Sequence, residues 1–287
     1  MIGLPSWAIV AISAGAVGAA LVVHARVRRF LPEDPPGARK QQREPLVMVG
    51  CVLGQLVLAV AMLAGVPWFL SFALGVGLLA GMLDDFRKAQ GGIGWRGKAG
   101  FLAAASVLVA LGTAAQDSSP SSLECMARAG FAFAVINAVN FLDNTNGVLV
   151  AVAALPLVLG GDGVPGAELA AFAGWVFVGF LPFNWPKARC IAGDAGAYTL
   201  GVLLAWDALA APSLLNALAL TCVPLVDFVQ VVSMRLALGF APWIADRRHL
   251  PHIVVSIGLP QWLVAPLFAG LAWGGFVGLR ALEDWAR

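Results

Sequence analysis

Charged residues are scarce in this chain of 287 residues. They make up 12% of the sequence, whereas hydrophobic residues make up 60%, and the mean hydropathy is +0.85. Soluble domains usually carry about a quarter charged residues, so this composition predicts an integral membrane protein. The net charge of +2 is small, and we expect no nucleic-acid partner.

Cysteine is rare as well. The four cysteines lie far apart and form no CxxC pair, which argues against a disulfide framework or a zinc site. They are Cys51, Cys125, Cys190 and Cys222. The chain also has no internal repeat, no low-complexity tail and no boundary between domains, so we expect a single domain over residues 1–287.

Long apolar segments alternate with short polar ones along the whole chain. Segments of this kind cross a bilayer as helices, because a helix satisfies all of its own backbone hydrogen bonds. We therefore predict an all-α, polytopic membrane protein with about ten transmembrane helices. Their approximate ranges are 5–23, 46–65, 66–83, 99–115, 123–142, 148–159, 167–183, a segment ending near 209, 213–236 and 261–279.

Several of these segments carry glycines four residues apart. Such pairs let helices approach closely, and they occur at Gly50 and Gly54 and at Gly77 and Gly81. A further row in the last span suits either a homodimer or packing within the chain; it consists of Gly270, Gly274 and Gly278.

The positions of the cations predict the orientation. With both termini on the outer side, all but three of the 18 Lys and Arg residues fall on the inner side. The exceptions are Arg128, Arg280 and Arg287. Because inner loops carry an excess of cations, we expect the loops at about 31–45, 87–98, 184–198 and 239–256 to face the cytoplasm.

The most unusual polar stretch runs from residue 137 to 147. Asn137, Asn140 and Asn144 follow helical spacing and share one face, with Asp143 and Asn146 beside them at the inner end of the fifth span. Carboxamide and carboxylate groups at that depth can hold a metal or a phosphate. The alternative is a polar helix cap with hydrogen bonds between helices.

Two more acidic motifs lie on the same side. Asp84 and Asp85 end the third span, where a carboxylate pair suits a metal-bound diphosphate, with one member acting as a base. The alternative is an ordinary ion pair of Asp84 with Lys88 and a solvated Asp85. The sequence Gly-Asp-Ala-Gly at 193–196 opens a helix, which is typical of a metal and phosphate site or of an Asp N-cap.

The last inner loop combines cations with histidines. Arg247 and Arg248 alone would be typical of a topology signal. Because His249 and His252 accompany them, the loop favours an anion-binding strip.

Two further groups complete this side of the chain. Lys98, with Arg87 and Lys88, fits a phosphate-steering patch or a topology signal equally well. Asp227 lies near the inner end of its span, and either belongs to the site or forms one side of a helix–helix hydrogen bond. Carboxylates at a membrane edge are costly, so the convergence of several on one side favours a single site.

The order of these motifs resembles the polyprenyl-phosphate N-acetylhexosamine-1-phosphate transferase family, glycosyltransferase family 4. The family includes undecaprenyl-phosphate N-acetylglucosamine-1-phosphate transferases and phospho-N-acetylmuramoyl-pentapeptide transferase. The resemblance covers nearly all of the chain, from Asp34 to His252. The matching segments are 34–40, 83–85, 137–147, 182–184 with 193–196 and 200–201, 224–227 and 247–252.

This resemblance implies a reaction. A sugar 1-phosphate, foremost an N-acetylhexosamine 1-phosphate, passes from a UDP-sugar to undecaprenyl or another polyprenyl phosphate, and UMP is released. Such a step starts a glycan of the cell envelope, O-antigen among them, on a lipid carrier. It implies a bacterial cytoplasmic (inner) membrane, with the site facing the cytoplasm.

The resemblance also implies roles for single residues. The cofactor is Mg²⁺, with Mn²⁺ as a substitute, and its ligands are Asp194 and Asn140. Asp84, Asp85 and Asp143 take the catalytic roles around the metal and the diphosphate. The substrate-binding residues are Asn137, Asn144, Asn146, Lys98, Arg247, Arg248, His249, His252 and Asp227.

Four positions depart from the family pattern. Asn146 replaces a usual second aspartate, Ala197 replaces a serine, and Ile191 stands where a phenylalanine usually stacks on uracil. Pro251 interrupts the histidine loop, which is closest to that of the simpler N-acetylhexosamine enzymes and so favours a small UDP-sugar.

Two other functions fit parts of the sequence. One is a homologue that binds lipid or nucleotide without turnover, which the departures keep open. The other is a membrane transporter with coupling-ion carboxylates, although transporters tend to place these near the bilayer midplane in both halves of a repeat.

Overall fold

The fold is known from a computed structural model. It describes residues 4–27, 30–36, 44–117, 119–160, 166–244 and 246–286. Residues 37–43 of the predicted first inner loop, and Arg287, lie outside the described residues.

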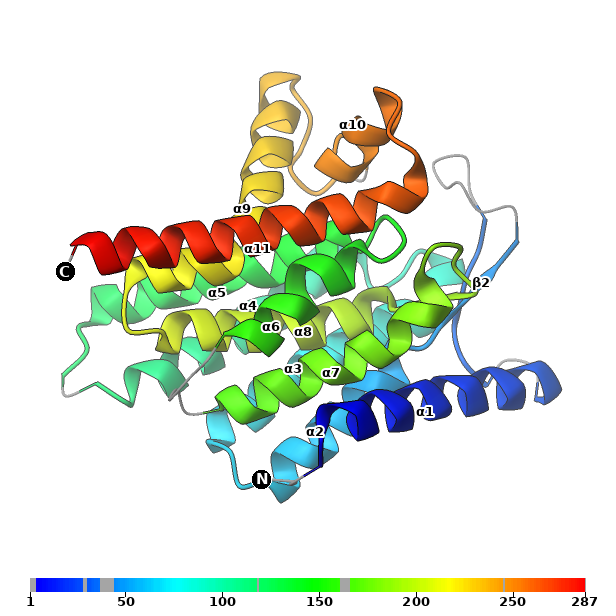
Figure 1. Ribbon diagram of the computed structural model, residues 1–287, viewed down its shortest axis with the longest axis horizontal. Coiled ribbons are helices and arrows are strands. Elements are labelled where there is room, and N and C mark those ends of the chain that lie inside the picture. Colours follow the sequence, from blue (N-terminus) through cyan, green and yellow to red (C-terminus); the bar gives the residue numbers. More distant parts are fainter. Residues whose placement is uncertain are drawn as a thin grey trace.

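The prediction of an all-α membrane protein is confirmed in its main part, since helices dominate the described ranges (Figure 1). They are α1 (Ser6–Arg26), α2 (Gly50–Leu63), α3 (Trp68–Phe86), α4 (Gly94–Ala114), α5 (Ser122–Leu142), α6 (Leu155–Leu159), α7 (Ala167–Asn184), α8 (Gly193–Ala210), α9 (Leu214–Ala237), α10 (Leu250–Ser256) and α11 (Gln261–Ala286). A 3₁₀ turn, η1 (Lys88–Gln90), follows α3, and a π-helical turn, η2 (Val150–Ala154), precedes α6.

Seven helices of the described ranges are long and apolar enough to cross a membrane: α1, α3, α4, α5, α7, α9 and α11. The predicted second and sixth spans correspond to shorter apolar helices, α2 and the η2–α6 segment. The predicted eighth span corresponds to α8, which is not among the seven. A polytopic membrane protein is thus confirmed, while the count of ten spans and the outward termini stay predictions.

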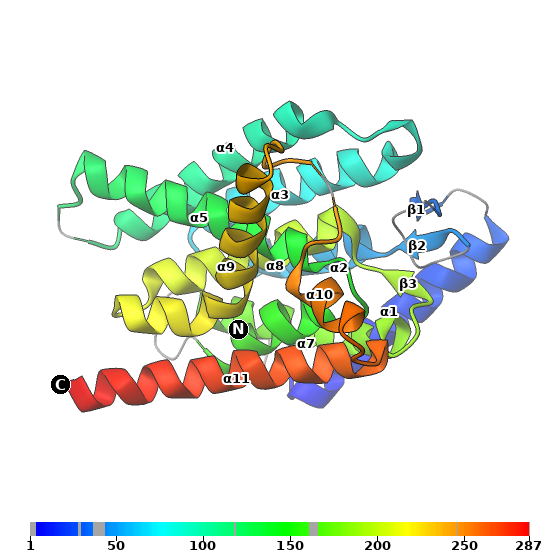
Figure 2. The same ribbon diagram turned by 90° about the horizontal axis from the view of Figure 1, so that it is seen from above.

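A small sheet was not predicted. Strands β1 (Glu33–Asp34), β2 (Leu46–Met48) and β3 (Cys190–Ile191) lie side by side, with β2 antiparallel to β1 and parallel to β3 (Figure 2). The ladder continues where Val49 N–H donates to Ile191 C=O at 3.0 Å. Because residues 46–48 pair as a strand, α2 begins at Gly50 rather than at 46. The sheet ties the first inner loop to the segment that precedes Asp194.

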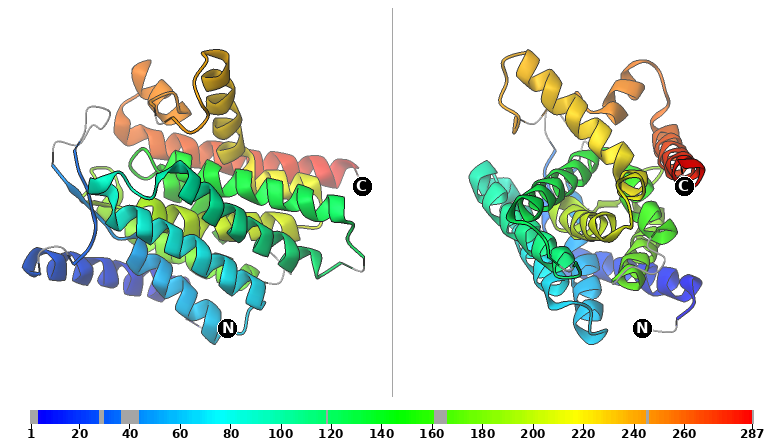
Figure 3. Two further views of the ribbon diagram at one scale, coloured as in Figure 1. Left: turned by 180° about the vertical axis from the view of Figure 1, so that it is seen from behind. Right: turned by 90° about the vertical axis from the view of Figure 1, so that its left-hand side faces the viewer.

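Helix α8 forms the centre of the bundle. It is buried from Gly193 to Ala208 and packs against α3 and α5, and the end-on view in Figure 3 shows it surrounded by other helices. The predicted close packing at glycines is confirmed on two helices. An added Cβ at Gly81 of α3 would lie 2.3 Å from Ala195 Cα, and one at Gly50 would lie 2.0 Å from Ala192 O.

The glycine row of α11 behaves differently. A Cβ at Gly270, Gly274 or Gly278 would meet nothing within 4 Å among the described residues. Packing within the described chain therefore does not explain the row, and the homodimer stays a prediction.

Helix α9 changes direction in its middle. Pro224 lies inside the helix, where it lacks the N–H of an i→i−4 hydrogen bond. The C-terminal half stands away from the bundle beside α10 (Figures 1 and 3). This half brings Asp227 and Arg235 to the loop that ends at α10.

Asn184 joins two loops at the end of the bundle that holds the sheet. It is buried at the C-terminus of α7; its Oδ1 accepts from Gly147 N–H at 2.6 Å, and its Nδ2 donates to Cys190 C=O at 3.0 Å. The Gly147 backbone has φ +77°, so the turn after α5 is fixed by glycine and by this side chain together.

We predict that Asn184→Ala lowers the free energy of unfolding by about 2–3 kcal/mol, because it leaves a buried donor and a buried acceptor unpaired. Thermal unfolding of detergent-purified protein measures this change. Asn146→Ala is the matched control, because Asn146 makes a single exposed bond, to Pro186 C=O. Equal melting temperatures for the two variants would contradict the joining role.

Candidate active site

Three buried carboxylates meet where α3 ends and α8 begins. Asp84 and Asp85 occupy the last turn of α3, and Asp194 occupies the first turn of α8. One oxygen from each lies within 4.8 Å of the others, and all three residues are buried. The structure therefore brings together two acidic motifs that are more than a hundred residues apart.

Asp85 holds the start of α8 in place. Its Oδ1 accepts from Asp194 N–H and its Oδ2 from Ala195 N–H, both at 3.0 Å. These are free amides of a helix N-terminus, which a carboxylate stabilises. A solvated Asp85 is thus excluded. Asp194 is not the N-cap either, because Ala192 occupies that position.

Two lysines bind the other two carboxylates. Lys98 Nζ lies 2.9 Å from Asp84 Oδ2 and 2.6 Å from Asp194 Oδ2, and Lys88 Nζ lies 3.5 Å and 3.4 Å from the same residues. Asp84 also accepts from Ile93 N–H at 3.0 Å. Although burial opposes the charge of Lys88, the carboxylates of Asp194, Asp85 and Asp84 raise its pKa above the usual value. The predicted Asp84–Lys88 pair exists, but within a larger network.

This cluster suits a hard divalent cation. Three carboxylates against two ammonium groups leave a net negative charge in a buried place, and oxygen ligands are those that Mg²⁺ prefers. Asn140, the second predicted metal ligand, is separated from Asp194 by the side chain of Tyr198. Its Nδ2 lies 3.5 Å from Tyr198 Oη, and that hydroxyl donates to Asp194 Oδ2 at 3.2 Å.

The predicted asparagine face lines a cavity. Asn137, Asn140 and Asn144 all contribute to the wall of a cavity of about 500 Å³ between α4, α5, α8 and α9. Asn146 instead donates to Pro186 C=O and is not among the described residues that line it. The other lining residues are Trp95, Lys98, Ala99, Phe133, Phe141, Tyr198, Phe228, Val232, Arg235, Pro242, Trp243, Asp246 and His249.

Asp143 lies just beyond α5, beside the acidic cluster. Partial burial, together with the negative charges of Asp194 and Asp85, raises the pKa of its carboxyl well above the usual value. The folded state thus binds this proton more tightly than the unfolded state. Stability contributed by the protonated group is present at low pH and is lost as pH rises through the range between the two pKa values.

From this sign we predict that Asp143→Asn stabilises the protein at about pH 8 and has little effect at about pH 4. Melting temperatures in EDTA, which removes metal ions, measure the difference between the variant and the wild type. A difference that did not change with pH would contradict the raised pKa.

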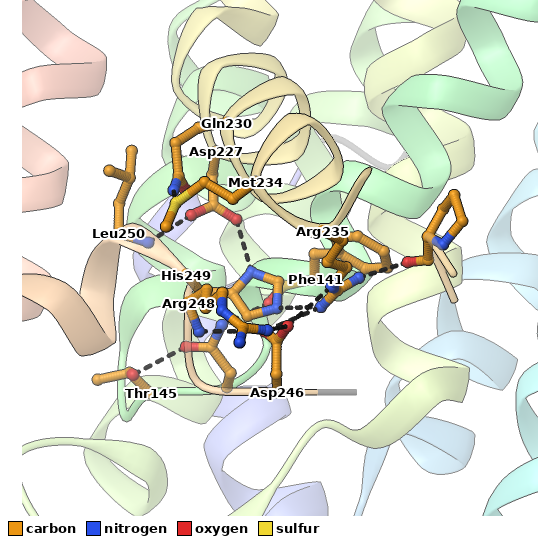
Figure 4. Close-up of polar contacts among 12 residues, drawn as sticks. Phe141, Thr145, Asp227, Gln230, Met234, Arg235, Asp246, Arg248, His249 and Leu250 are labelled. Carbon is orange, nitrogen blue, oxygen red and sulfur yellow. Dashed lines mark hydrogen bonds and ion pairs between the residues drawn. The ribbon is translucent and has the colours of Figure 1, made fainter. Parts of the chain in front are cut away.

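His249 and Asp227 form the second polar centre of the cavity (Figure 4). His249 Nδ1 lies 2.8 Å from Asp227 Oδ2, and Leu250 N–H donates to Asp227 Oδ1 at 2.6 Å. Both side chains are buried. Asp227 therefore orients the histidine loop rather than bonding only to a neighbouring helix.

Arg235 belongs to this centre but was not predicted to do so. It is 2% exposed, its guanidinium lies 5.1 Å from the Phe141 ring, and it binds Asp246 through Nε at 3.1 Å and Nη2 at 3.2 Å. Its position eight residues after Asp227, two turns along α9 on the same face, was the available signal. Tyr198 was missed as well, although the only tyrosine of the chain lies one turn after Asp194.

The other residues of the histidine loop do not form a continuous cationic strip. Arg248 Nη1 binds Asp246 at 2.8 Å, and Arg247 is exposed. Although burial opposes ionisation, hydrogen bonds from Arg235 and Arg248 hold the pKa of Asp246 well below the usual value. Burial and the charge of Arg247 lower the pKa of His252 to about 4, so His252 is uncharged at neutral pH.

Comparison with known proteins gives a family and several relatives. The model of glycosyl transferase family 4 matches residues 66–211. An undecaprenyl-phosphate alpha-N-acetylglucosaminyl 1-phosphate transferase of Escherichia coli (strain K12) is 28% identical over an alignment of 145 residues, and the match covers 44% of this chain and 39% of the relative. A decaprenyl-phosphate N-acetylglucosaminephosphotransferase of Mycobacterium tuberculosis (strain H37Rv) is 28% identical over an alignment of 233 residues, and the match covers 65% of this chain and 56% of the relative.

The family match includes the acidic cluster and the asparagine face but ends before Asp227 and the histidine loop. The alignments span 39% and 56% of the two relatives' own lengths. Since the matched range of 146 residues, from 66 to 211, is more than half of the 287, the chain belongs to glycosyl transferase family 4.

Proposed function

We propose that this protein transfers a sugar 1-phosphate, foremost N-acetylhexosamine 1-phosphate, from a UDP-sugar to undecaprenyl or another polyprenyl phosphate. The observation that carries this proposal is the buried cluster of Asp84, Asp85 and Asp194 beside a cavity lined by Lys98 and Tyr198. The names of the two relatives, an undecaprenyl-phosphate and a decaprenyl-phosphate transferase, support the lipid acceptor.

The reaction is a direct displacement at phosphorus. An oxygen of the lipid phosphate attacks the β-phosphorus of the UDP-sugar, and the bond from that phosphorus to the oxygen of UMP breaks. Asp194, Asp84 and Asn140 would hold a divalent cation, which would supply positive charge to the diphosphate. Lys98 and Lys88 add two fixed positive charges that do not depend on the cation.

The carboxylates have separate tasks in this proposal. Asp85 orients the first turn of α8, and with it Asp194. Asp84, the predicted base, accepts hydrogen bonds from Lys98 and Ile93 at rest. Because these contacts engage both of its oxygens, this proposal places Asp84 beside the cation and leaves the role of proton acceptor to another group. Direct attack inverts the configuration at phosphorus; retention would require a covalent aspartyl intermediate instead.

The substrates occupy the cavity between the two polar centres. Asn137, Asn144 and His249 line it and contact the sugar or the diphosphate. The remaining predicted substrate-binding residues lie further out. In this proposal the substrate meets Arg247, Arg248 and His252 only at the rim of the cavity, and Asn146 only from the neighbouring loop. Asp227 acts through His249.

The cation distribution supports a cytoplasmic location of the site in a bacterial inner membrane, where both substrates are made available. The sheet, whose strand β3 directly precedes α8 in the chain, lies at one end of the bundle, and the C-terminus lies at the other (Figure 1). A transporter would place such groups near the midplane.

Release of UMP tests the proposal. Detergent-purified protein receives undecaprenyl phosphate, Mg²⁺ and a panel of UDP-sugars, UDP-N-acetylglucosamine first. We expect release with one donor, loss of release in EDTA, and recovery on addition of Mg²⁺ or Mn²⁺. A folded protein that released no UMP with any donor would instead be a binding homologue without turnover.

A further inference from the structure

His249 lies between two groups of opposite chemistry (Figure 4). Its Nδ1 faces Asp227 Oδ2 at 2.8 Å, and its Nε2 faces Arg235 Nη2 at 3.4 Å. The ring is buried and packs edge-on against Phe141, with 5.3 Å between ring centroids. Neither ring nitrogen therefore needs water as a partner.

The two neighbours decide where the ring proton lies. An ionised carboxylate only accepts hydrogen bonds, so the hydrogen must be on Nδ1. A guanidinium only donates, so Nε2 must present its lone pair. Both contacts are satisfied by the neutral imidazole with hydrogen on Nδ1. A second proton, on Nε2, would point at the N–H groups of Arg235.

Arg235 is held firmly enough to impose this choice. Asp246 binds its Nε and Nη2, Pro242 C=O accepts from its Nη1 at 2.6 Å, and Phe141 lies against its face. Because four of its contacts come from outside the histidine ring, the guanidinium does not depend on His249 for its position.

The charged and titratable groups around His249 come from three elements. Asp227 of α9 favours a protonated ring, and Arg235 of the same helix opposes it. From the loop before α10, Asp246 faces Arg235, and Arg248 binds Asp246. From α10, the His252 ring lies 6.5 Å away and is uncharged at neutral pH. Arg235 is the cation in direct contact.

We propose that Arg235 is a positioning residue that keeps His249 as the neutral Nδ1–H tautomer, with the Nε2 lone pair available as a proton acceptor in the cavity. This inference deepens the proposed function and rests on it for its role in catalysis. When the lipid phosphate arrives as a monoanion, one Arg235 N–H turns to a phosphate oxygen. The phosphate O–H bond then breaks, an Nε2–H bond forms, and Asp227 stabilises the positive charge on the ring.

Histidine nitrogen NMR tests the tautomer without any turnover. The chain has three histidines, so ¹⁵N-histidine labelling of the whole protein in detergent gives few signals, and His249→Gln assigns the one of interest. At neutral pH we expect a protonated Nδ1 and an unprotonated Nε2. A protonated Nε2, alone or together with Nδ1, would overturn the proposal.

The role of Arg235 is tested by two variants with a matched control. In Arg235→Gln we expect the titration midpoint of His249 to rise by about one unit or more, because Asp227 then acts unopposed. In Arg248→Gln, which also loses a bond to Asp246 but touches no histidine nitrogen, we expect no change. If Arg235→Gln does not fold, Asp227→Asn serves as the test. We then expect a lowered titration midpoint of His249 and the loss of its single tautomer. An unchanged midpoint in the folded variant contradicts the inference.

The rate of UMP release against pH gives a second readout. Transfer requires the neutral His249 ring. The acidic limb of the pH–rate profile should therefore move to higher pH in Arg235→Gln, by the same amount as the titration midpoint measured by NMR. If the wild-type protein transfers nothing, the proposed function fails while the NMR result still stands. If transfer occurs but the limb does not move with the midpoint, His249 is not the proton acceptor.

Discussion

Asp194→Asn is expected to lower the rate of UMP release by about 10³-fold or more. Asp194 binds Lys98, Lys88 and Tyr198 within the buried acidic cluster, and the proposed function places it at the diphosphate. Asparagine keeps the shape of the side chain but removes the charge that holds a divalent cation. Initial rates at saturating Mg²⁺ and UDP-sugar measure the loss.

Asp117→Asn is the control for this variant. Asp117 pairs with Arg128 at the surface, and neither residue is among the described residues that line the cavity. It should keep the full rate. If Asp194→Asn kept a tenth or more of the rate with an unchanged melting temperature, the cluster would not be the centre of the reaction.

Gly81→Ala is expected to lower the free energy of unfolding by about 3 kcal/mol or more, because its added Cβ would overlap backbone atoms of α8. The Cβ would lie 2.3 Å from both Ala195 Cα and Ala195 N, and backbone cannot move aside as a flexible side chain can. The variant should also lose activity, since α3 and α8 together carry Asp84, Asp85 and Asp194.

Gly75→Ala on the same helix is the matched control. A Cβ there meets nothing within 4 Å among the described residues, and alanine favours a helix by up to about 1 kcal/mol over glycine. Thermal unfolding in one detergent compares the pair. Similar melting temperatures for Gly81→Ala and Gly75→Ala would show that α3 and α8 are not in close contact.

Much of the helical framework follows from apolar length and from the cations between the spans. The meeting of Asp84 and Asp85 with Asp194 was predictable in outline, because the ends of neighbouring spans on one side of a membrane lie close together. The sheet was not predictable. Strands of two and three residues are too short to show alternation, and β2 pairs with β3 across more than a hundred residues of sequence.

The partners of the polar groups were harder to predict than their location. Lys88 and Lys98 were equally consistent with topology signals, and their contacts with Asp84 and Asp194 depend on how the α3–α4 loop folds. In the histidine loop, Asp246 forms ion pairs with Arg248 and with Arg235 of α9. The cations of the loop therefore do not form a continuous strip in space. A buried arginine in an apolar helix was the overlooked signal.

Transfer of the β-phosphate tests the central claim most directly. The protein receives UDP-N-acetylglucosamine labelled with ³²P at the β-phosphate, together with undecaprenyl phosphate and Mg²⁺, and the lipid is extracted. The proposed function predicts label in the lipid phase, with unlabelled UMP released in equal amount and neither product formed by Asp194→Asn. Unlabelled lipid, or label that stays with the nucleotide, would contradict sugar 1-phosphate transfer from this donor, and the same result across the panel of UDP-sugars would contradict it altogether.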